Sequence, residues 1–355
     1  MKKFQKSIFV IFLISVLLFS LFGCSTSPGE SEQENKKGAA LPKQINIGIL
    51  RVPNDETIAR SKKIFDKYFT EKGIQCNFIV FDSGVDANKA FASGSIDFAT
   101  MGDTNAIVAL SRGLDVEMIW IHEVLGDVEA LAVKKDSNIH RIEDLVGKKI
   151  ATPFASTSHY SLLNALKNVG IEDKVELLDM QTADIVAAWQ RGDIEAAYTW
   201  QPSLGELLKD GKVLISSEDL AKQGYITANV ELVRKEFAQK YPDLVASFIA
   251  CLAEAGSIYR ENPQEGANIT AQELEIPSEK TLQQMRGSIW LTPEEQLSKE
   301  YLGTKDSIGD FVTIMKDTAD FLERQGSIQE APTQQEFNTF LNSSYIEEAI
   351  KILNK

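Results

Sequence analysis

Short apolar stretches alternate with longer amphipathic stretches from residue 45 onward, and this rhythm constrains the fold more than any other feature. Helices fit over Glu56–Lys72, Val85–Ala92 and Asn105–Arg112, and each is followed by a glycine suited to a helix end. The stretches that fit strands are Ile45–Leu50, Cys76–Phe81, Ile96–Met101, Val116–Ile121 and Ala130–Lys134. Strands that alternate with helices build βαβ units around a mostly parallel sheet. The sequence therefore predicts an α/β fold.

The rhythm restarts at Leu145 and changes again beyond Asn229. The second set of strands and helices fits Lys148–Thr152, Tyr160–Val169, Val175–Asp179, Asp184–Gln190 and Ile194–Trp200. The last part of the chain fits helices over Pro242–Arg260, Ser278–Trp290 and Lys305–Gln325. About 310 residues follow the N-terminal region, which is enough for two units of roughly 100–200 residues each.

One internal repeat supports two similar lobes. Residues 91–102 (FASGSIDFATMG) match residues 189–200 (WQRGDIEAAYTW) at an offset of 98. Each copy has a helix end, a glycine and an Ile-acidic pair that enters a strand. The match predicts that two α/β lobes were built on one plan.

A second repeat places the connection between the lobes. Residues 130–136 (ALAVKKD) resemble residues 231–237 (ELVRKEF), and we expect adjacent strands that cross between the lobes. The chain would then enter lobe two near Lys135 and return near Val233. The predicted division is lobe one over 44–134 and 234–330, lobe two over 135–233, and a helical tail over 331–355. The lobes would close on a ligand by hinge motion, and the tail would pack on lobe one or contact a membrane partner.

The N-terminus fits an export signal that ends in a lipidated cysteine. Three lysines within the first six residues precede an uncharged stretch over residues 7–22, shorter than the ~20 apolar residues of a membrane span. Residues 21–24 (LFGC) resemble a lipobox, so we expect a signal peptide over 1–23 and acylation of Cys24. Acyl chains hold a protein on a membrane without crossing it. We therefore expect a cell-membrane protein, anchored on the extracytoplasmic face.

Residues 24–43 are almost wholly polar and fit a flexible tether.

Composition excludes several other classes of protein. Loss of the three signal lysines takes the net charge from −14 to about −17, which argues against nucleic-acid binding. Cys76 and Cys251 lie far apart and fit core thiols better than a disulfide. No metal-ligand spacing occurs, so we expect neither a metal nor a cofactor.

The loops between strands and helices are the predicted binding site. In open α/β sheets a ligand lies beyond the carboxyl ends of the strands, where helix N-termini offer unpaired N–H groups and positive potential. Ser156, Thr157 and Ser158 stand in succession before one predicted helix. One hydroxyl would suffice as a cap, whereas three favour contact with a sulfonate or phosphate. Thr104 could reach the anion from the opposite lobe, while Asp103 would repel it or cap its own helix.

Four more side chains could contribute to the cleft. Glu129, just before the crossing, could face the ammonium group of a zwitterionic ligand. Trp200 and Tyr160 offer aromatic faces to a cation or to carbon atoms, or belong to the core. His159 either hydrogen-bonds a ligand or packs, and the sequence does not separate the two.

Motifs of catalysis are missing from the sequence. It contains no Gly-x-Ser-x-Gly elbow, no phosphate-binding Gly-x-x-x-x-Gly-Lys-Ser/Thr loop and no His-Glu-x-x-His. Binding without chemistry is the simpler interpretation, and we do not expect an enzyme.

Four stretches resemble the taurine-binding proteins of ABC importers. They are residues 81–84 (FDSG), 129–135 (EALAVKK), 154–163 (FASTSHYSLL) and 187–194 (AAWQRGDI), and the similarity extends from about Ile45 to Gln325. The shorter motifs also occur in relatives for alkanesulfonates, nitrate or thiamine precursors. The resemblance implies a type II periplasmic-binding-protein fold, capture of taurine or a related small sulfonate, and delivery to an ABC permease with its ATPase. We expect a monomer.

The resemblance also implies contacts: Ser156, Thr157 and His159 around the anion, Glu129 near the amine, and Trp200 along the cleft wall.

Two positions depart from the family pattern. Asp103 and Thr104 stand where paired serines are common, and Asn229 stands where relatives carry an acidic residue. Without that carboxylate the case for an ammonium group is weaker. A receptor for another aliphatic sulfonate is therefore the alternative, and a biosynthetic enzyme on the same fold is a less favoured one.

Overall fold

The computed structural model of the chain describes residues 40–355. The expected signal peptide, Cys24 and most of the expected tether lie outside the described residues.

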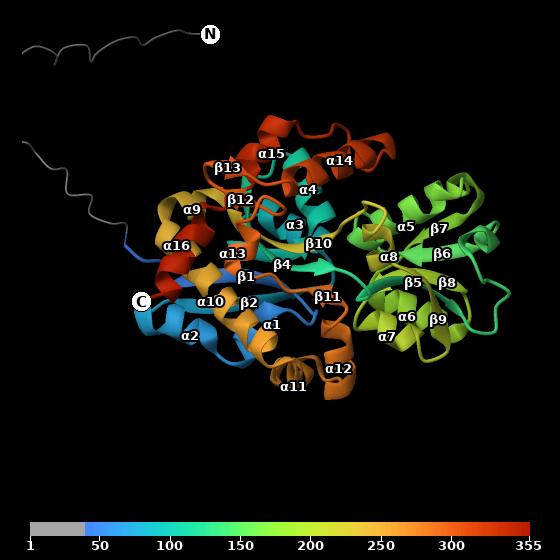
Figure 1. The fold of residues 1–355 in the computed structure, drawn as a ribbon, viewed down its shortest axis with the longest axis horizontal. Helices are drawn as coiled ribbons and strands as arrows, with labels where there is room; N and C mark the ends of the chain where they lie inside the picture. Colours follow the sequence, from blue (N-terminus) through green and yellow to red (C-terminus); the bar gives the residue numbers. More distant parts are fainter. Residues whose placement is uncertain (1–39) are drawn as a thin grey trace, which may run out of the picture. The chain divides into compact units, whose positions relative to one another are not determined.

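A six-stranded mixed sheet forms the first part of the molecule, which we call lobe one (Figure 1). Its strands are β1 (Gln44–Leu50), β2 (Gln75–Phe81), β3 (Phe98–Gly102), β4 (Val116–Leu125), β10 (Ala228–Arg234) and β11 (Ser288–Ile289). They lie in the order β11-β4-β10-β3-β1-β2. β1 is parallel to β2 and β3, whereas β10 is antiparallel to both β3 and β4.

A five-stranded mixed sheet forms lobe two. Its strands are β5 (Glu129–Lys134), β6 (Lys149–Thr152), β7 (Glu176–Asp179), β8 (Ala196–Trp200) and β9 (Gly211–Ser216). The order is β7-β6-β8-β5-β9, with β6 parallel to β7 and β8 and with β5 antiparallel to β8 and β9.

The two sheets share one plan, which explains the internal repeats. Each sheet contains three parallel strands whose order across the sheet is second, first, third in the sequence (β2-β1-β3 and β7-β6-β8), and an antiparallel strand follows the third. That exchanged strand is β10 in lobe one and β5 in lobe two, and these carry the second repeat. The first repeat covers the α3–β3 and α6–β8 units.

The crossing between the lobes differs from the prediction in two respects. β5 and β10 do not pair with each other, because each is the antiparallel strand of its own sheet. The chain therefore enters lobe two between Leu125 and Glu129, and it returns just before Ala228. The predicted crossings near Lys135 and Val233 were several residues late.

Helices cover both sheets. In an order of 2-1-3, successive right-handed crossovers run in opposite directions across the sheet and so place their helices on opposite faces. The helices of lobe two are α5 (Thr157–Asn168), α6 (Thr182–Arg191), α7 (Ser203–Leu207) and α8 (Ser217–Ala221). Those of lobe one are α1 (Asp55–Ser61), α2 (Ile64–Tyr68), α3 (Gly84–Ala92), α4 (Asp103–Ser111), α9 (Lys235–Lys240), α10 (Pro242–Glu261), α11 (Pro263–Leu274), α12 (Ser278–Met285), α13 (Pro293–Gln296), α14 (Phe311–Arg324), α15 (Gln334–Phe340) and α16 (Ser344–Leu353).

Three long helices of the prediction are interrupted. The stretch Glu56–Lys72 breaks at Lys63, whose φ of 57° is left-handed, and continues as α2 and a 3-10 helix. The stretch Ser278–Trp290 leaves the helix after α12, because its next residues pair with β4 as β11. The stretch Lys305–Gln325 begins with a hairpin of β12 (Gly303–Thr304) and β13 (Ser307–Ile308) before α14.

Apolar side chains fill both lobes. In lobe one Phe98 of β3 stacks on Phe248 of α10, with ring centroids 4.2 Å apart. In lobe two Leu131 and Val133 of β5 face one cluster while Ala130 and Ala132 face the other, as the alternation of a strand requires. The C-terminal helices belong to lobe one: α16 packs on α10, and the amide N of Asn342 donates to the carbonyl of Met118 on β4.

Candidate functional site

A small cavity of about 30 Å³ lies between the two lobes. A buried water needs roughly 10–15 Å³ in the same measure, so the cavity has room for two or three waters in this state. Its wall comes from strand ends and the loops that follow them, as expected for an α/β sheet. The residues around it are Leu50, Val52, Pro53, Gly84, Gly102, Asn105, Glu123, Leu125, Val128, Glu129, Ser156, Thr157, Trp200, Gln201 and Asn229.

The N-termini of three helices meet at this cavity. Gly84 is the first residue of α3, Gly102 precedes α4, and Thr157 is the first residue of α5. The first N–H groups of a helix have no partner within it and carry positive potential. The arrangement is therefore suited to a small anion.

Glycine is required where these helices approach each other. A Cβ on Gly84 would lie 2.6 Å from Asn105, and a Cβ on Gly102 would lie 2.8 Å from Cγ2 of Thr157. Asn105 also bridges the lobes, because its Nδ2 donates to the carbonyl of Ala155 at 2.7 Å. The lobes therefore touch at the end of the cavity that the helix N-termini form.

The three hydroxyl groups that we expected to hold the anion are engaged elsewhere. Ser156 caps α5: its Oγ accepts from the amide of His159 and donates to the carbonyl of Pro153 at 2.6 Å. Thr157 Oγ1 donates to Glu129 Oε2 at 2.5 Å, and Ser158 Oγ donates to the same oxygen at 2.8 Å. With these hydroxyl groups engaged, the backbone N–H groups at the three helix N-termini are the donors that suit an anion here.

Glu129 is fully buried and accepts from a third hydroxyl group. Ser217 Oγ of α8 donates to its Oε1 at 2.7 Å. Burial raises the pKa of Glu129, although these hydroxyl groups act in the opposite direction. Because both oxygens have partners, this carboxyl is poorly disposed to accept from a ligand ammonium as well.

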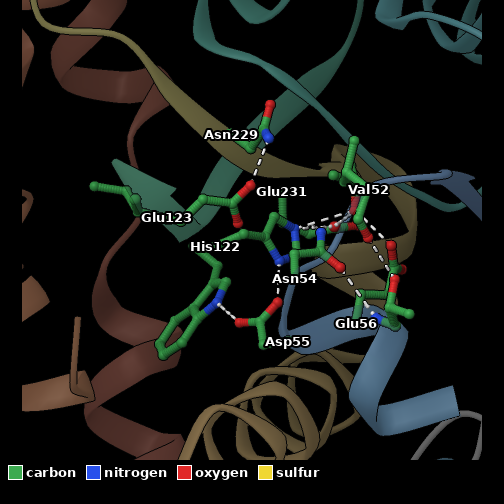
Figure 2. Close-up of polar contacts among 12 residues, drawn as sticks. Val52, Asn54, Asp55, Glu56, His122, Glu123, Asn229 and Glu231 are labelled. Carbon is green, nitrogen blue, oxygen red and sulfur yellow. Dashed lines mark hydrogen bonds and ion pairs between the residues drawn. The ribbon is translucent and has the colours of Figure 1, made fainter. Parts of the chain in front are cut away.

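A second carboxyl group in the cavity has a free oxygen. Asn229 Nδ2 on β10 donates to Glu123 Oε1 on β4 at 2.6 Å, as Figure 2 shows. Glu123 Oε2 is buried and has no hydrogen-bond partner among residues 40–355. Burial raises the pKa of Glu123 to about 7, and the positive charge of His122 opposes the shift. Glu123 is therefore the better candidate to receive a cationic group.

A buried polar cluster fixes the loop before α1 at the edge of the cavity. His122 lies between Asp55 and Glu231, with Nδ1 2.5 Å from Asp55 Oδ1 and Nε2 2.9 Å from Glu231 Oε2 (Figure 2). Burial disfavours a charged imidazole, but the two carboxyl groups raise the pKa of His122 well above its usual value. The cluster links α1, β4 and β10. Thr57 then anchors the loop itself, since its hydroxyl donates to the carbonyl of Val52 at 2.7 Å.

The structure places five of the ten predicted site residues on the cavity wall and five away from it. Those on the wall are Ser156, Thr157, Glu129, Trp200 and Asn229. Ser158 is buried against Glu129, as described above.

Of the other four residues, three make structural contacts in this state, and the fourth, Thr104, does not make one with its hydroxyl among residues 40–355. His159 stacks on Phe154 at 4.4 Å between centroids, and burial lowers its pKa to about 4, so it is neutral. Tyr160 packs edge-on against Phe321 of α14 at 5.3 Å. Asp103 accepts from the amides of Thr104 and Ala228, and burial raises its pKa to about 8. The Thr104 hydroxyl is buried without a partner.

Sequence reasoning missed Glu123 and Asn105. A signal for Glu123 was present, because His122 and Glu123 are two ionisable residues inside an otherwise apolar stretch. The prediction ended the strand at Ile121, whereas β4 continues to Leu125. Asn105 gave no signal, since its partner is a backbone carbonyl in the other lobe.

Residues 40–355 contain neither a metal-binding cluster nor a membrane-spanning helix. These residues contain no group of three or more His, Cys, Asp or Glu side chains arranged to bind a metal ion. None of the helices in this part of the chain combines the length and the apolar character needed to cross a bilayer.

Comparison with known proteins gives concordant matches. The family model described as NMT1/THI5 like matches residues 66–266. The taurine-binding periplasmic protein of Escherichia coli K12 is 36% identical over 297 residues, covering 82% of this chain and 88% of that protein.

Two solved structures share the fold. The alkanesulfonate-binding protein SsuA from Xanthomonas axonopodis pv. citri, bound to MOPS, has a TM-score of 0.71 at 19% identity, covering 86% of this chain and all of that one. The desulfurization enzyme DszB has a TM-score of 0.61 at 17% identity, covering 88% and 99%. At such identities the likeness shows the fold alone, and the predicted periplasmic-binding-protein fold is confirmed.

Proposed function

This chain belongs to the NMT1/THI5-like family, and from that membership and the interlobe cavity we propose that it is the substrate-binding component of an ABC importer, with taurine as its ligand. It captures the ligand between the lobes and delivers it to the permease and its ATPase. The similarity to the taurine-binding periplasmic protein supports this role, since it extends over most of both chains.

The observation that carries the choice of ligand is the free oxygen of Glu123. It lies in the same cavity as three helix N-termini, so one small space offers both an anion site and a carboxylate for a cation. Taurine has a sulfonate and an ammonium group separated by two carbon atoms. A zwitterion of that size uses both ends of the cavity.

The size of the ligand limits the affinity. At about 1.5 kcal/mol for each of about seven heavy atoms, binding reaches about 10 kcal/mol, which is a Kd of roughly tens of nanomolar. Tighter binding would indicate a larger ligand.

A receptor for another aliphatic sulfonate is the second candidate. It would apply if Glu123 alone does not suffice for an ammonium, because the amide of Asn229 adds no charge of its own. An enzyme is a weaker alternative. DszB has the same fold, but the cavity wall contributed by residues 40–355 contains neither a cysteine nor a histidine.

We also propose that the protein acts outside the cytoplasm, held to the membrane by a lipid on Cys24. The relative is a periplasmic protein, and the lipobox resemblance supports the anchor. Labelling with radioactive palmitate tests it: a Cys24→Ser variant should lose the label that the native chain retains.

Isothermal titration of the purified protein tests the ligand. We expect heat with taurine and little with β-alanine or sulfate. Glu123→Gln should weaken taurine binding by about 10- to 150-fold, because a charge-assisted hydrogen bond contributes about 1.5–3 kcal/mol, and should leave ethanesulfonate binding unweakened.

Glu117→Gln is the matched control. Glu117 is also a buried glutamate of β4, but it accepts from Asn342 of the tail and lies away from the cavity. Equal loss of taurine and ethanesulfonate in Glu123→Gln would refute the ammonium role. Absence of heat with every ligand would refute the proposed function.

A further inference from the structure

In the described part of the chain, hydroxyl groups are the side-chain donors to Glu129. Its two oxygens accept from Thr157, Ser158 and Ser217 at 2.5–2.8 Å. Its side chain is fully buried, and the cavity wall formed by residues 40–355 contains neither a lysine nor an arginine. A carboxylate here has donors but no counter-ion.

Of the three hydroxyl groups, that of Thr157 belongs to a residue on the cavity wall. An ionised carboxylate only accepts, and a hydroxyl has one proton to give. While Glu129 is charged, the proton of Thr157 points to Glu129 and the hydroxyl presents lone pairs to the cavity. Those lone pairs repel the oxygen atoms of an anion.

We propose that Glu129 takes up one proton when a sulfonate binds, and that this proton turns the Thr157 hydroxyl into a donor to the ligand. The proton comes from solvent and binds Glu129 Oε2. That O–H then donates to Thr157 Oγ1, and the Thr157 hydroxyl turns its own proton toward a sulfonate oxygen. The buffer acid loses this proton, and no other covalent bond of the protein or the ligand forms or breaks; the inference rests on the proposed function.

The surroundings of Glu129 favour this proton. Burial already raises its pKa. Two ionisable groups face Glu129. One is Asp103 of α4, whose pKa is raised by burial and by the charge of Glu129. The other is Tyr198 of β8, whose hydroxyl contacts Ser217, a hydrogen-bond donor to Glu129. Glu123 shares the cavity. All are acidic groups, so an arriving anion makes a charged Glu129 less favourable still.

Proton uptake measured by calorimetry tests the proposal. Ethanesulfonate is titrated into the protein in two buffers that differ in ionisation enthalpy and carry no sulfonate group. Since this ligand has no amine, the titration does not depend on ammonium binding at Glu123. We expect uptake of up to one proton in the native protein and a fall in affinity of about tenfold per pH unit over the linked range.

Glu129→Gln separates the proposal from simple repulsion. Its amide donates to Thr157 permanently, so the uptake assigned to this site should vanish and binding at high pH should be at least as tight as in the native protein. In a Thr157→Val background, where no hydroxyl can turn, Glu129→Gln should give no such gain. Glu117→Gln should keep the native uptake.

Each outcome decides between the two proposals. Native binding with equal proton uptake in Glu129→Gln would overturn this inference and leave the proposed function standing. If Glu129→Gln does not fold, Thr157→Val alone decides. Native proton uptake in that variant would overturn the proposed coupling between the Glu129 proton and the Thr157 hydroxyl. Absence of ethanesulfonate and taurine binding to the native protein would remove the proposed function and this inference with it.

Discussion

A methyl group on Gly102 should hold the two lobes apart. Gly102 has φ −65° and ψ 148°, a conformation that any residue adopts without strain. An added Cβ would lie 2.8 Å from Cγ2 of Thr157, which belongs to the other lobe. Gly102→Ala therefore introduces its closest contact across the cleft and not within lobe one.

The expected cost follows from the overlap. Carbon atoms in contact prefer about 3.5–4.0 Å, so closure would require a shift of close to 1 Å. Overpacking of this kind costs about 1–3 kcal/mol, which corresponds to about 5- to 150-fold weaker taurine binding. Alanine before the first turn of α4 also costs up to about 1 kcal/mol, but that loss lowers the melting temperature of the free protein and not the affinity of the closed state.

A second substitution makes the test specific. Thr157→Ser removes Cγ2 and keeps the hydroxyl, so the double variant should recover most of the affinity that Gly102→Ala loses. Calorimetry gives the Kd for taurine of the native protein, the two single variants and the double variant. Thermal unfolding without ligand gives the stability of each. Native affinity in Gly102→Ala, or no recovery in the double variant, would refute the closure geometry.

Two further outcomes follow from the contacts outside the cavity. Tyr160→Phe should change taurine affinity less than about twofold in the same titration, because the ring packs on Phe321 away from the cavity; a tenfold loss would place Tyr160 on the ligand. Burial raises the pKa of Glu56 to about 8 and that of Asp103 to about 8. The folded protein thus binds more protons than the unfolded chain, and stability should fall as the pH rises from about 5 to 8. Glu56→Gln should flatten this slope in urea unfolding, and an unchanged slope would assign it to other groups.

The fold was predictable because its determinants are local and repeated. Apolar periodicity marks each strand, and glycines mark helix ends such as Gly94 and Gly113, both at positive φ. The order of strands across a sheet has no such local mark. The exchange of β5 and β10 between the sheets was therefore misread as one pair of adjacent strands, although the repeat that carries it was seen.

The site was only partly predictable, because hydrogen bonds join residues far apart in the sequence. Three hydroxyl groups in succession did indicate a polar site at the start of α5. Their partner was the same Glu129 that we had assigned to the ammonium, 28 and 29 residues away from Thr157 and Ser158. Donor and acceptor were each identified, but nothing in the sequence says that they satisfy each other.

The substitution at residue 229 has a different meaning once β4 and β10 are seen side by side. In the sequence alone, Asn229 stands where the family pattern has an acidic residue in the cleft. This difference weakened the argument that the ligand has an ammonium group. In the sheet Asn229 is the direct partner of Glu123, and its amide donates to that carboxyl group. An aspartate at 229 would put a second negative charge within hydrogen-bonding distance of Glu123 and raise its pKa further. With an amide there, Glu123 keeps one oxygen occupied and the other free. The carboxylate that a zwitterionic ligand needs is thus provided from the neighbouring strand, so its absence at 229 is not an argument against taurine.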